Sequence, residues 1–435
     1  MAQQYWIETL GCPKNQVDSD KLVGTMTADG MQQAERLEDA DLVVVNTCAF
    51  VEEARQESID TILGLEQARR PDAELVVTGC LAERYGSELA EALPEVDRVA
   101  PFGVPVTLGA TRREMSNEAL VEPQSGFDLL ELPRPASDAP WAYVKVAEGC
   151  DRNCGFCAIP SFRGKQRSRQ LSSILAEVDQ LEVQEVVLVA QDLAAFGRDQ
   201  GKGTRSIVPL VNQVAERVPW VRLLYLYPSD LSDELIDTIL QTGVPYFDLS
   251  LQHVSPPLMR KMRRWGDGER FANRIADIRA KDQRAAFRSN FIVGYPGETE
   301  EDHDQLLNFV ESARLDWCGF FAYSEEAGTY GAELDGKVPA TLRDERLAEL
   351  RAIQDRITTE KRDALIGSTV TVLVDSPGVA RSSAEAPEID GIIGVPESLA
   401  VGSFAAVTIT DANGPDLVAA SPAASTSTNA MTEAP

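Results

Sequence analysis

The sequence lacks any apolar run long enough to cross a membrane, which takes about 18 or more consecutive apolar residues. Its first residues, Met-Ala-Gln-Gln-Tyr-Trp, also lack the basic stretch and the apolar core of a secretory signal. At 435 residues the chain is long enough for roughly two to four domains. We therefore expect a multidomain cytoplasmic protein that has no membrane partner.

Positive charge is scarce. Lys and Arg number 41 against 69 Asp and Glu, so the formal net charge is −28. Such a surface repels phosphate backbones and attracts basic partners, although acidic charge also serves solubility alone. Hydrophobic residues make up 43% of the sequence, as in ordinary globular proteins. The charge, and not the apolar content, is what sets this chain apart.

Cysteine is present in an odd number, seven, which argues for reduced thiols and metal ligands rather than disulfides in a chain without a signal. Cys150, Cys154 and Cys157 follow an apolar strand with the spacing C-x3-C-x2-C. Four-iron clusters normally take four cysteines, so three thiolates would leave one iron open. Zinc or plain buried thiols are the alternatives. Structural zinc normally takes four ligands, however, and no fourth Cys or His lies nearby, since the next possible ligand along the chain is His253. The spacing therefore predicts an iron–sulfur cluster whose open iron binds S-adenosylmethionine (SAM).

The pattern of apolar runs and turns predicts an α/β protein of three domains. Strands alternate with helices at 1–122, which predicts a parallel sheet, and a proline-rich linker follows at 123–140. Six strand–helix repeats at 141–363 fall short of the eight of a TIM barrel, so we expect an open (βα)6 partial barrel and a trailing helix. A small β-barrel is predicted at 364–420 and a disordered tail at 421–435.

The individual elements are predicted from hydrophobic periodicity. The expected strands are 5–10, 41–46, 74–78, 142–147, 185–190, 221–227, 246–251, 287–293, 316–323, 368–375 and 404–411, and the expected helices are 19–29, 51–69, 171–181, 207–217, 233–242, 269–281, 300–313 and 341–366.

Three further cysteines, Cys12, Cys48 and Cys80, are scattered in sequence, but each follows a predicted strand and precedes a helix. In a parallel sheet those strand ends share one edge, where open α/β sheets bind ligands. Gly11 and Gly79 give the backbone room beside a bulky ligand. The alternative is three cysteines that behave as small buried hydrophobes. The arrangement favours a second cluster with an open site.

The run around Cys150, with Phe156 before Cys157, resembles the radical-SAM signature. The sequence that follows resembles the methylthiotransferases, and the resemblance covers nearly the whole chain up to residue 420. The last domain resembles a TRAM domain. The matching runs are 11–19, 46–48, 159–169 and 291–299. Ser250 and Phe196 depart from the pattern of the family, which usually has proline and tyrosine there.

Several details resemble the RimO-type branch of that family, which modifies the twelfth protein of the small ribosomal subunit. They are the runs 11–15, 57–60 and 385–391. The branch implies methylthiolation of an aspartate β-carbon, with SAM as both methyl donor and radical source. It also implies two 4Fe-4S clusters, one that cleaves SAM to methionine and a 5′-deoxyadenosyl radical and one that holds the sulfur. An electron donor such as a flavodoxin or a ferredoxin is implied as well. Whether the substrate is the free ribosomal protein or the assembled subunit stays open.

The charge of the last domain supports this branch. Between 365 and 420 Arg381 is the sole basic residue, against seven acidic ones. An RNA-binding barrel needs a basic surface with aromatic residues, so we expect no direct tRNA binding and a basic ribosomal protein instead. The acidic residues are Asp375, Glu385, Glu388, Asp390, Glu397, Asp411 and Asp416.

SAM contacts are expected where barrel strands end. We expect Phe156 near the adenine, Gln191 and Asp192 near the sugar or amino-acid groups, and Asn290 to Glu298 along the adenine. Structural roles fit these residues equally well.

A basic run is expected to pair with the SAM carboxylate or with the substrate aspartate, although exposed charge would explain it too. Its members are Arg163, Lys165, Arg167 and Arg169. His253 suits a structural role as well as a proton-transfer role. Cys318 lies within a predicted strand and is expected to be an inert core thiol.

Two other functions remain open from the sequence. A sister class that methylthiolates adenosine in tRNA has the same cysteines, and tRNA binding at low salt would favour it. A non-catalytic iron–sulfur factor that docks on ribosomes is the other, and failure to cleave SAM would favour that one.

Overall fold

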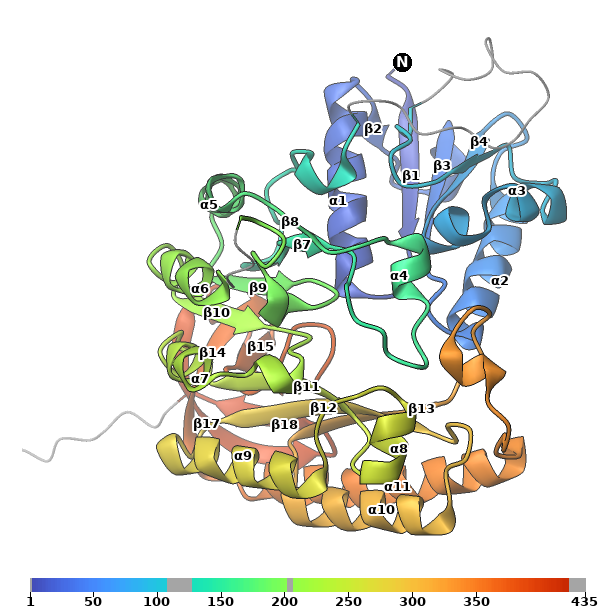
Figure 1. Cartoon of the computed structure of the whole chain (residues 1–435). Helices are drawn as coiled ribbons and strands as arrows, with labels where there is room; N and C mark the ends of the chain where they lie inside the picture. Colours follow the sequence, from blue (N-terminus) through green and yellow to red (C-terminus); the bar gives the residue numbers. More distant parts are fainter. Residues whose placement is uncertain (1, 108–126, 202–205, 422–435) are drawn as a thin grey trace, which may run out of the picture. The chain divides into compact units, whose positions relative to one another are not determined.

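The computed structural model describes residues 2–107, 127–201 and 206–421 (Figure 1). The predicted linker at 123–140 begins outside the described residues, and the predicted tail lies outside them from residue 422 onwards. Contacts between residues divide the chain into two compact units, Met1–Gln354 and Asp355–Pro435. The finer domain boundaries stay predictions.

The first part of the larger unit is the parallel sheet that strand–helix alternation predicts, with the order β2-β1-β3-β4-β5. Its central strands are continuous apolar runs, which is typical of strands buried on both faces. Helix α1 packs on one face through Leu22 and Met26, whereas α2 and α3 cover the other through Ile62 and Leu81 (Figure 1). The elements are β1 (Gln4–Thr9), α1 (Pro13–Ala28), β2 (Gln32–Gln33), β3 (Leu42–Thr47), α2 (Glu52–Ala68), β4 (Glu74–Gly79), α3 (Cys80–Ala92) and β5 (Arg98–Ala100).

Helix α1 begins earlier than the predicted helix at 19–29, which is a correction with a local cause. Cys12 is its extended N-cap residue and Pro13 its first helical residue. Proline suits that place because the first N–H of a helix has no partner within the helix. Lys14 and Asn15 consequently lie in the first turn, directly after Cys12.

The second part of the larger unit confirms the open partial barrel. Its six parallel strands form two sheets, β6-β9-β10 and β11-β12-β13, joined by an isolated bridge between Leu226 and Leu249. Five helices lie along the outer side of these strands (Figure 1). The strands are β6 (Trp141–Lys145), β9 (Glu185–Val189), β10 (Trp220–Leu223), β11 (Tyr246–Gln252), β12 (Ala286–Val293) and β13 (Trp317–Ala322), and the helices are α5 (Leu171–Leu181), α6 (Ile207–Ala215), α7 (Asp233–Leu240), α9 (Gly268–Lys281) and α10 (Glu300–Ala313).

Strand β10 ends at Leu223, short of the predicted strand at 221–227. The cause is Tyr225, whose φ of 65° is left-handed and cannot continue a strand.

Several short elements that hydrophobic periodicity does not predict lie around the cysteine loop and after the fourth barrel strand. They are β7 (Ala147–Glu148), α4 (Ile159–Phe162), β8 (Arg167–Ser168) and α8 (Pro256–Lys261).

The smaller unit contains the predicted small β-barrel, which is closed in the order β14-β15-β16-β18-β17. Val372, Val407 and Leu417 belong to its apolar core. The helix α11 (Ala340–Asp363), predicted at 341–366, precedes it in the chain. The strands are β14 (Thr369–Ser376), β15 (Val379–Ser382), β16 (Ile393–Gly394), β17 (Phe404–Asn413) and β18 (Asp416–Ala420).

Candidate functional site

The structure brings Cys12, Cys48 and Cys80 together at the carboxyl ends of β1, β3 and β4. A Cβ atom on Gly11 would lie 2.9 Å from the Cys48 sulfur, so the strand ends approach each other closely. Burial, together with the charges of Cys12 and Cys80, raises the pKa of the Cys48 thiol to about 12. We call these three residues the sheet triad.

Two asparagines hold the loops of the sheet triad in place. The Asn15 amide donates to the carbonyl oxygens of Leu10 (2.8 Å) and Thr47 (3.0 Å). The Asn46 amide donates to the carbonyl oxygen of Asn15 (2.8 Å) and to the Ser19 hydroxyl (2.9 Å). The cysteine positions are therefore fixed by side-chain hydrogen bonds as well as by the strands.

Two cations lie beside the sheet triad. The Arg163 guanidinium donates to Asn15 Oδ1 at 2.8 Å and to the Cys80 sulfur at 3.0 Å. Burial opposes ionisation of Cys12, but the charges of Lys14 and Arg163 outweigh it and lower the pKa of its thiol. Burial keeps the pKa of Cys80 raised despite Arg163. The charge of the site thus favours thiolates or another bound anion.

Cys150, Cys154 and Cys157, which we call the loop triad, lie between β7 and α4. The amide of Gly155 within this loop donates to the carbonyl oxygen of Met262 (2.8 Å). Burial is the main cause that raises the pKa of Cys150 to about 11 and that of Cys157 to about 12.

Both triads offer only sulfur as ligand, which is the donor set of an iron–sulfur cluster. Within the described ranges, no three or more His, Cys, Asp and Glu side chains are grouped closely enough to hold a single metal ion. Each cysteine of a four-iron cluster binds a different iron, so cluster ligands need not converge on one point.

Arginines surround the loop triad. Arg152 pairs with Asp192 (2.6 Å) and with Asp230, and its guanidinium lies 3.9 Å from the centroid of the Tyr227 ring. Arg264 lies over the same ring at 3.8 Å and donates to the Cys154 sulfur at 3.4 Å. The cysteine loop is therefore tied to the ends of the neighbouring barrel strands.

The predicted SAM contacts have different surroundings. Gln191 donates to Glu148 (2.7 Å), and burial raises the pKa of Asp192 despite its pairing with Arg152. Phe156 packs against an apolar cluster that includes Met262 and Tyr295. All three lie beside the cysteine loop or belong to it.

Asn290 and Glu298 have no hydrogen bond or ion pair with a cysteine among the described residues. The Asn290 Oδ1 is buried and, in the part of the chain that is described, has no hydrogen-bond partner. Glu298 accepts from Arg346 (2.9 Å) and from the amide of Gly294, and burial raises its pKa to about 7. Glu298 thus has the partners of a structural ion pair.

The basic run is mostly engaged in ion pairs. Arg167 pairs with Asp128 on the surface, and Arg169 pairs with Glu177 at 2.6 Å, whereas Lys165 is exposed. His253 is fully buried and accepts from the amide of Ser255 (3.1 Å), and burial lowers its pKa to about 3. These surroundings favour the structural role for His253.

A buried charge network connects the sheet to the barrel. Lys145 on β6 pairs with Asp18 on α1 at 2.7 Å and also with Glu148. Arg163 pairs with the same Glu148 at 2.8 Å, and the two cations hold the pKa of this carboxyl well below its usual range despite burial. Lys145 is the last residue of β6 and interrupts the apolar sequence run 142–147, and that is the signal by which the sequence could have revealed the network.

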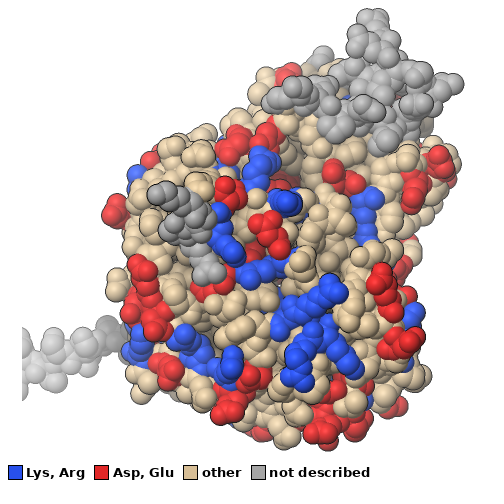
Figure 2. Space-filling view, in the orientation of Figure 1, with Lys and Arg blue, Asp and Glu red and all other residues tan. Residues whose placement is uncertain are grey.

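Although the net charge of the protein is strongly negative, basic side chains gather on the face that Figure 2 shows, in the region where Figure 1 draws α8. Arg260, Lys261 and Arg263 are exposed there, and none has an ion pair with a carboxylate among the described residues. Trp265 beside them is 43% exposed. We call these four residues the basic face. It adjoins the loop triad through Arg264.

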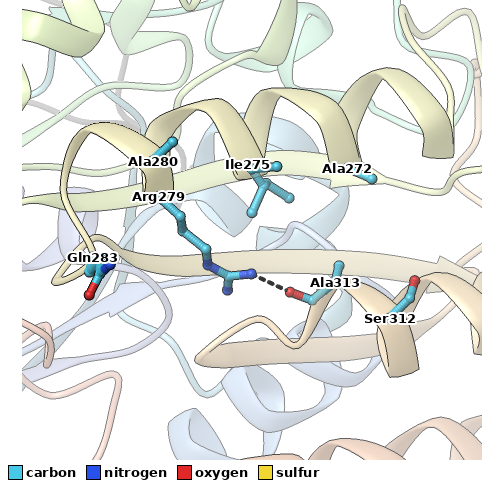
Figure 3. A pocket seen from close by; sticks show the side chains of 8 residues that line it. Ala272, Ile275, Arg279, Ala280, Gln283, Ser312 and Ala313 are labelled. Atoms are coloured by element: carbon cyan, nitrogen blue, oxygen red, sulfur yellow. Dashed lines mark hydrogen bonds between the residues drawn. The ribbon is translucent and has the colours of Figure 1, made fainter.

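A pocket of about 500 Å³ lies elsewhere, between α9 and α10 (Figure 3). Arg279 crosses it and donates to the carbonyl oxygen of Ala313 (2.7 Å). Its lining contains none of the cysteines and none of the predicted SAM contacts.

Among the helices of the described residues, we find none that is long and apolar enough to be a membrane span.

Known families and relatives match along the chain. The uncharacterized protein family UPF0004 matches residues 4–101, the radical SAM superfamily 144–310 and the TRAM domain 366–421. The ribosomal protein uS12 methylthiotransferase RimO of Moorella thermoacetica is 42% identical over 92% of this chain and 95% of that relative. The chain belongs to the uS12 methylthiotransferase (RimO) family. The RimO proteins of Myxococcus xanthus (95% of this chain, 90% of the relative) and Aquifex aeolicus (94% and 95%) are each 39% identical.

The RimO-type resemblance found in the sequence is thereby confirmed. A solved structure shares the fold: the radical SAM methyltransferase TsrM from Kitasatospora setae, with cobalamin and a [4Fe-4S] cluster bound. It has a TM-score of 0.50 and 13% identity, and the match covers 92% of this chain and 84% of that one.

Proposed function

We propose that this RimO-family protein attaches a methylthio group to the β-carbon of an aspartate in ribosomal protein uS12, with SAM as methyl donor and radical source. The observation that carries the proposal is a pair of cysteine triads in one compact unit, with Arg163 reaching from the sequence after the loop triad to Cys80 of the sheet triad. Because three thiolates leave one iron without a protein ligand, one site can take SAM and the other a sulfur.

The loop triad would hold one 4Fe-4S cluster and SAM, and the chemistry that a reduced cluster would supply there is the one-electron cleavage of SAM needed to react at an unactivated C–H bond. Arg152, fixed by Asp192 and Asp230, orients the cysteine loop. Arg264 offsets the negative charge of Cys154.

Residues beside the cysteine loop are proposed to contact SAM. Gln191, Asp192 and Phe156 lie there, and the unpartnered Oδ1 of Asn290 suits a donor on the adenine. Glu298 would act indirectly, by holding the loop after β12 through Arg346 and Gly294.

The sheet triad would hold a second 4Fe-4S cluster and the sulfur to be transferred. Arg163 and Lys14 are placed to offset the negative charge of thiolate and sulfide there. Asn15 and Asn46 fix the loops that carry the ligands.

The surface of the small β-barrel suits a basic protein. Glu388, Glu397 and Asp411 are exposed, whereas Arg381, the sole basic residue between 365 and 420, is buried and pairs with Asp375 at 2.6 Å. The described part of this segment therefore has no exposed cation for a phosphate backbone. These observations support uS12 over tRNA as the substrate. We also propose that the reaction takes place in the cytoplasm.

The basic face suits an acidic electron donor such as a flavodoxin or a ferredoxin. Opposite charge speeds the encounter of proteins, and an exposed tryptophan is a favoured contact residue. The carbonyl oxygen of Met262, in the same turn, binds the amide of Gly155 in the cysteine loop. A donor docked on this face would thus lie next to the loop triad.

The test is an anaerobic reaction of the reconstituted, reduced protein with SAM and uS12, followed by mass spectrometry. A gain of about 46 Da on one aspartate, hydrogen replaced by methylthio, is expected. The same gain in mass on tRNA and not on uS12 would mean that the protein modifies adenosine in tRNA instead. No cleavage of SAM by protein with both clusters loaded would favour a docking factor.

A further inference from the structure

Lys14 is a buried cation for which the described residues supply no carboxylate partner. The residue is 8% exposed and lies in the first turn of α1, two residues after Cys12. Among the described residues its ammonium has neither a carboxylate nor a hydrogen-bond acceptor within bonding distance. Nearby buried cations differ, because Lys145 pairs with Asp18 and Arg163 pairs with Glu148.

The Lys14 ammonium lies against an aromatic ring. Its Nζ lies 3.3 Å from the centroid of the Tyr225 ring. A ring face attracts a cation without neutralising it, so the charge stays available to an anion. The ring comes from the loop after β10, and the Tyr225 amide donates to the buried carboxylate of Asp248 at 3.0 Å. Sheet and barrel thus both contribute to this cation.

The place of Lys14 suits a carboxylate of the substrate. The reaction proposed for this protein attaches sulfur to the aspartate β-carbon, which is bonded directly to the carboxylate carbon. A cation that holds that carboxylate beside Cys12 therefore holds the reacting carbon near the sulfur. The N-terminus of α1, with its partial positive charge, adds to the attraction.

We infer that Lys14 binds the carboxylate of the aspartate that is modified, and that the Tyr225 ring positions the Lys14 ammonium. This inference rests on the proposed function and adds to it the group that selects an acidic residue. Lys14 makes and breaks no bond in this role, and it is a binding residue for the substrate.

The test combines enzyme variants with substrate variants. Wild type, K14Q and K14R are compared on uS12 and on uS12 whose target aspartate is replaced by asparagine, with binding, KM and kcat measured. For wild type, the loss of the carboxylate is expected to weaken uS12 binding about 10- to 100-fold, as for a charge-assisted hydrogen bond. K14Q should bind both substrates equally, and K14R should keep part of the preference.

Two controls separate a specific role from a general one. K281Q removes one positive charge, as K14Q does, but at an exposed ion pair between Lys281 on α9 and Asp237 on α7. It should leave the KM for uS12 unchanged. Y225L, which removes the ring, should raise KM about threefold to tenfold, whereas Y225F should stay close to wild type.

Each contrary result has a distinct meaning. An unchanged preference for aspartate in K14Q overturns the role of Lys14, and so does a K14Q defect confined to the KM for SAM. Loss of iron from the sheet triad in K14Q would assign Lys14 to cluster assembly and also overturn it. If wild type itself leaves uS12 unmodified, the proposed function fails first, and this inference fails with it.

Discussion

Both triads consist of three cysteines, but they are built differently. The loop triad comes from one short segment between β7 and α4, whereas the sheet triad needs the ends of three strands and the order in which those strands pair. The geometry of the first is set by a local backbone, and the geometry of the second by a whole sheet. The residues of a cofactor site can thus be set either by their spacing along one segment or by the order of strands in a sheet. The spacing is visible in the sequence itself, whereas the strand order has to be inferred from the predicted fold.

Their charge surroundings differ as well. The sheet triad has Arg163 and Lys14 beside it, and the pKa of Cys12 is lowered although the thiol is buried. At the loop triad, burial outweighs the nearby arginines and raises the pKa of Cys150 and Cys157. Burial also raises the pKa of Cys48 and of Cys80, so the lowered pKa in the sheet triad is confined to Cys12, the cysteine nearest to Lys14 in sequence.

Removal of one triad at a time gives the largest expected effect. C150A/C154A/C157A should lose about half of the iron and all cleavage of SAM, because an electron can no longer reach SAM. C12A/C48A/C80A should lose the same share of iron yet keep SAM cleavage, with no methylthio product. Iron content is measured by iron analysis, cleavage of SAM by the amount of 5′-deoxyadenosine formed, and the methylthio product by mass spectrometry. Equal behaviour of the two variants would contradict the division of roles.

Replacement of Arg163 tests whether the sheet triad depends on a residue supplied by the barrel. R163M leaves Glu148 and Asp18 with one buried cation fewer, so we expect a loss of about 3–5 kcal/mol in unfolding free energy. R167M, at an exposed pair with Asp128, should cost about 0–1 kcal/mol.

The same Arg163 variant has a spectroscopic outcome. Made in the C150A/C154A/C157A background, R163M should shift the reduction potential of the remaining cluster, because it removes the donor to Cys80. An unshifted potential would mean that Arg163 only joins the domains.

Matched glycine pairs test which backbone each triad needs. Gly79 and Gly30 both have a left-handed φ, but a Cβ would lie 2.6 Å from the Thr47 backbone in the first case and meet nothing within 4 Å in the second. G79A should therefore cost about 1–3 kcal/mol more than G30A and reduce iron binding at the sheet triad. Gly149 and Gly164 form the equivalent pair for the loop triad. Thermal unfolding and iron content give the comparison, and equal costs within a pair would refute the steric account.

Charge reversal on the basic face gives the smallest expected effect and affects the loop triad alone. R260E/K261E/R263E should slow reduction by flavodoxin about tenfold or more at low salt, since it removes electrostatic attraction. Reduction by dithionite should not change. Stopped-flow absorbance measures both rates, and a parallel loss with dithionite would show damage to the cluster instead.

The fold was largely predictable because its strands are short apolar runs separated by amphipathic helices. The predicted helices at 171–181 and 300–313 agree with α5 and α10 to the residue. Strands of two residues such as β2 and β16 carry no periodicity and could not be found. The early start of α1 depends on the capping by Cys12 and Pro13, which a search for hydrophobic periodicity overlooks.

The candidate site was predictable where one residue type defines it. Six cysteines follow from spacing and strand ends, and their ligand role stays a prediction. The partners of those cysteines depend on three-dimensional proximity between distant segments, as with Arg163 and Cys80 or Lys14 and Tyr225. Sequence alone could not predict these contacts, because no periodicity relates Arg163, which follows α4, to Cys80, which follows β4 far upstream in the chain.

The charge network of Asp18, Lys145, Glu148 and Arg163 also sets a mechanical condition. To swing the sheet away from the barrel would separate buried opposite charges, a motion that costs several kcal/mol. The separation of the two triads is therefore expected to stay fixed once the protein has folded. If the proposed function is correct, the segment of the substrate that carries the aspartate has to reach a rigid site, which an exposed loop does more readily than a helix or a sheet.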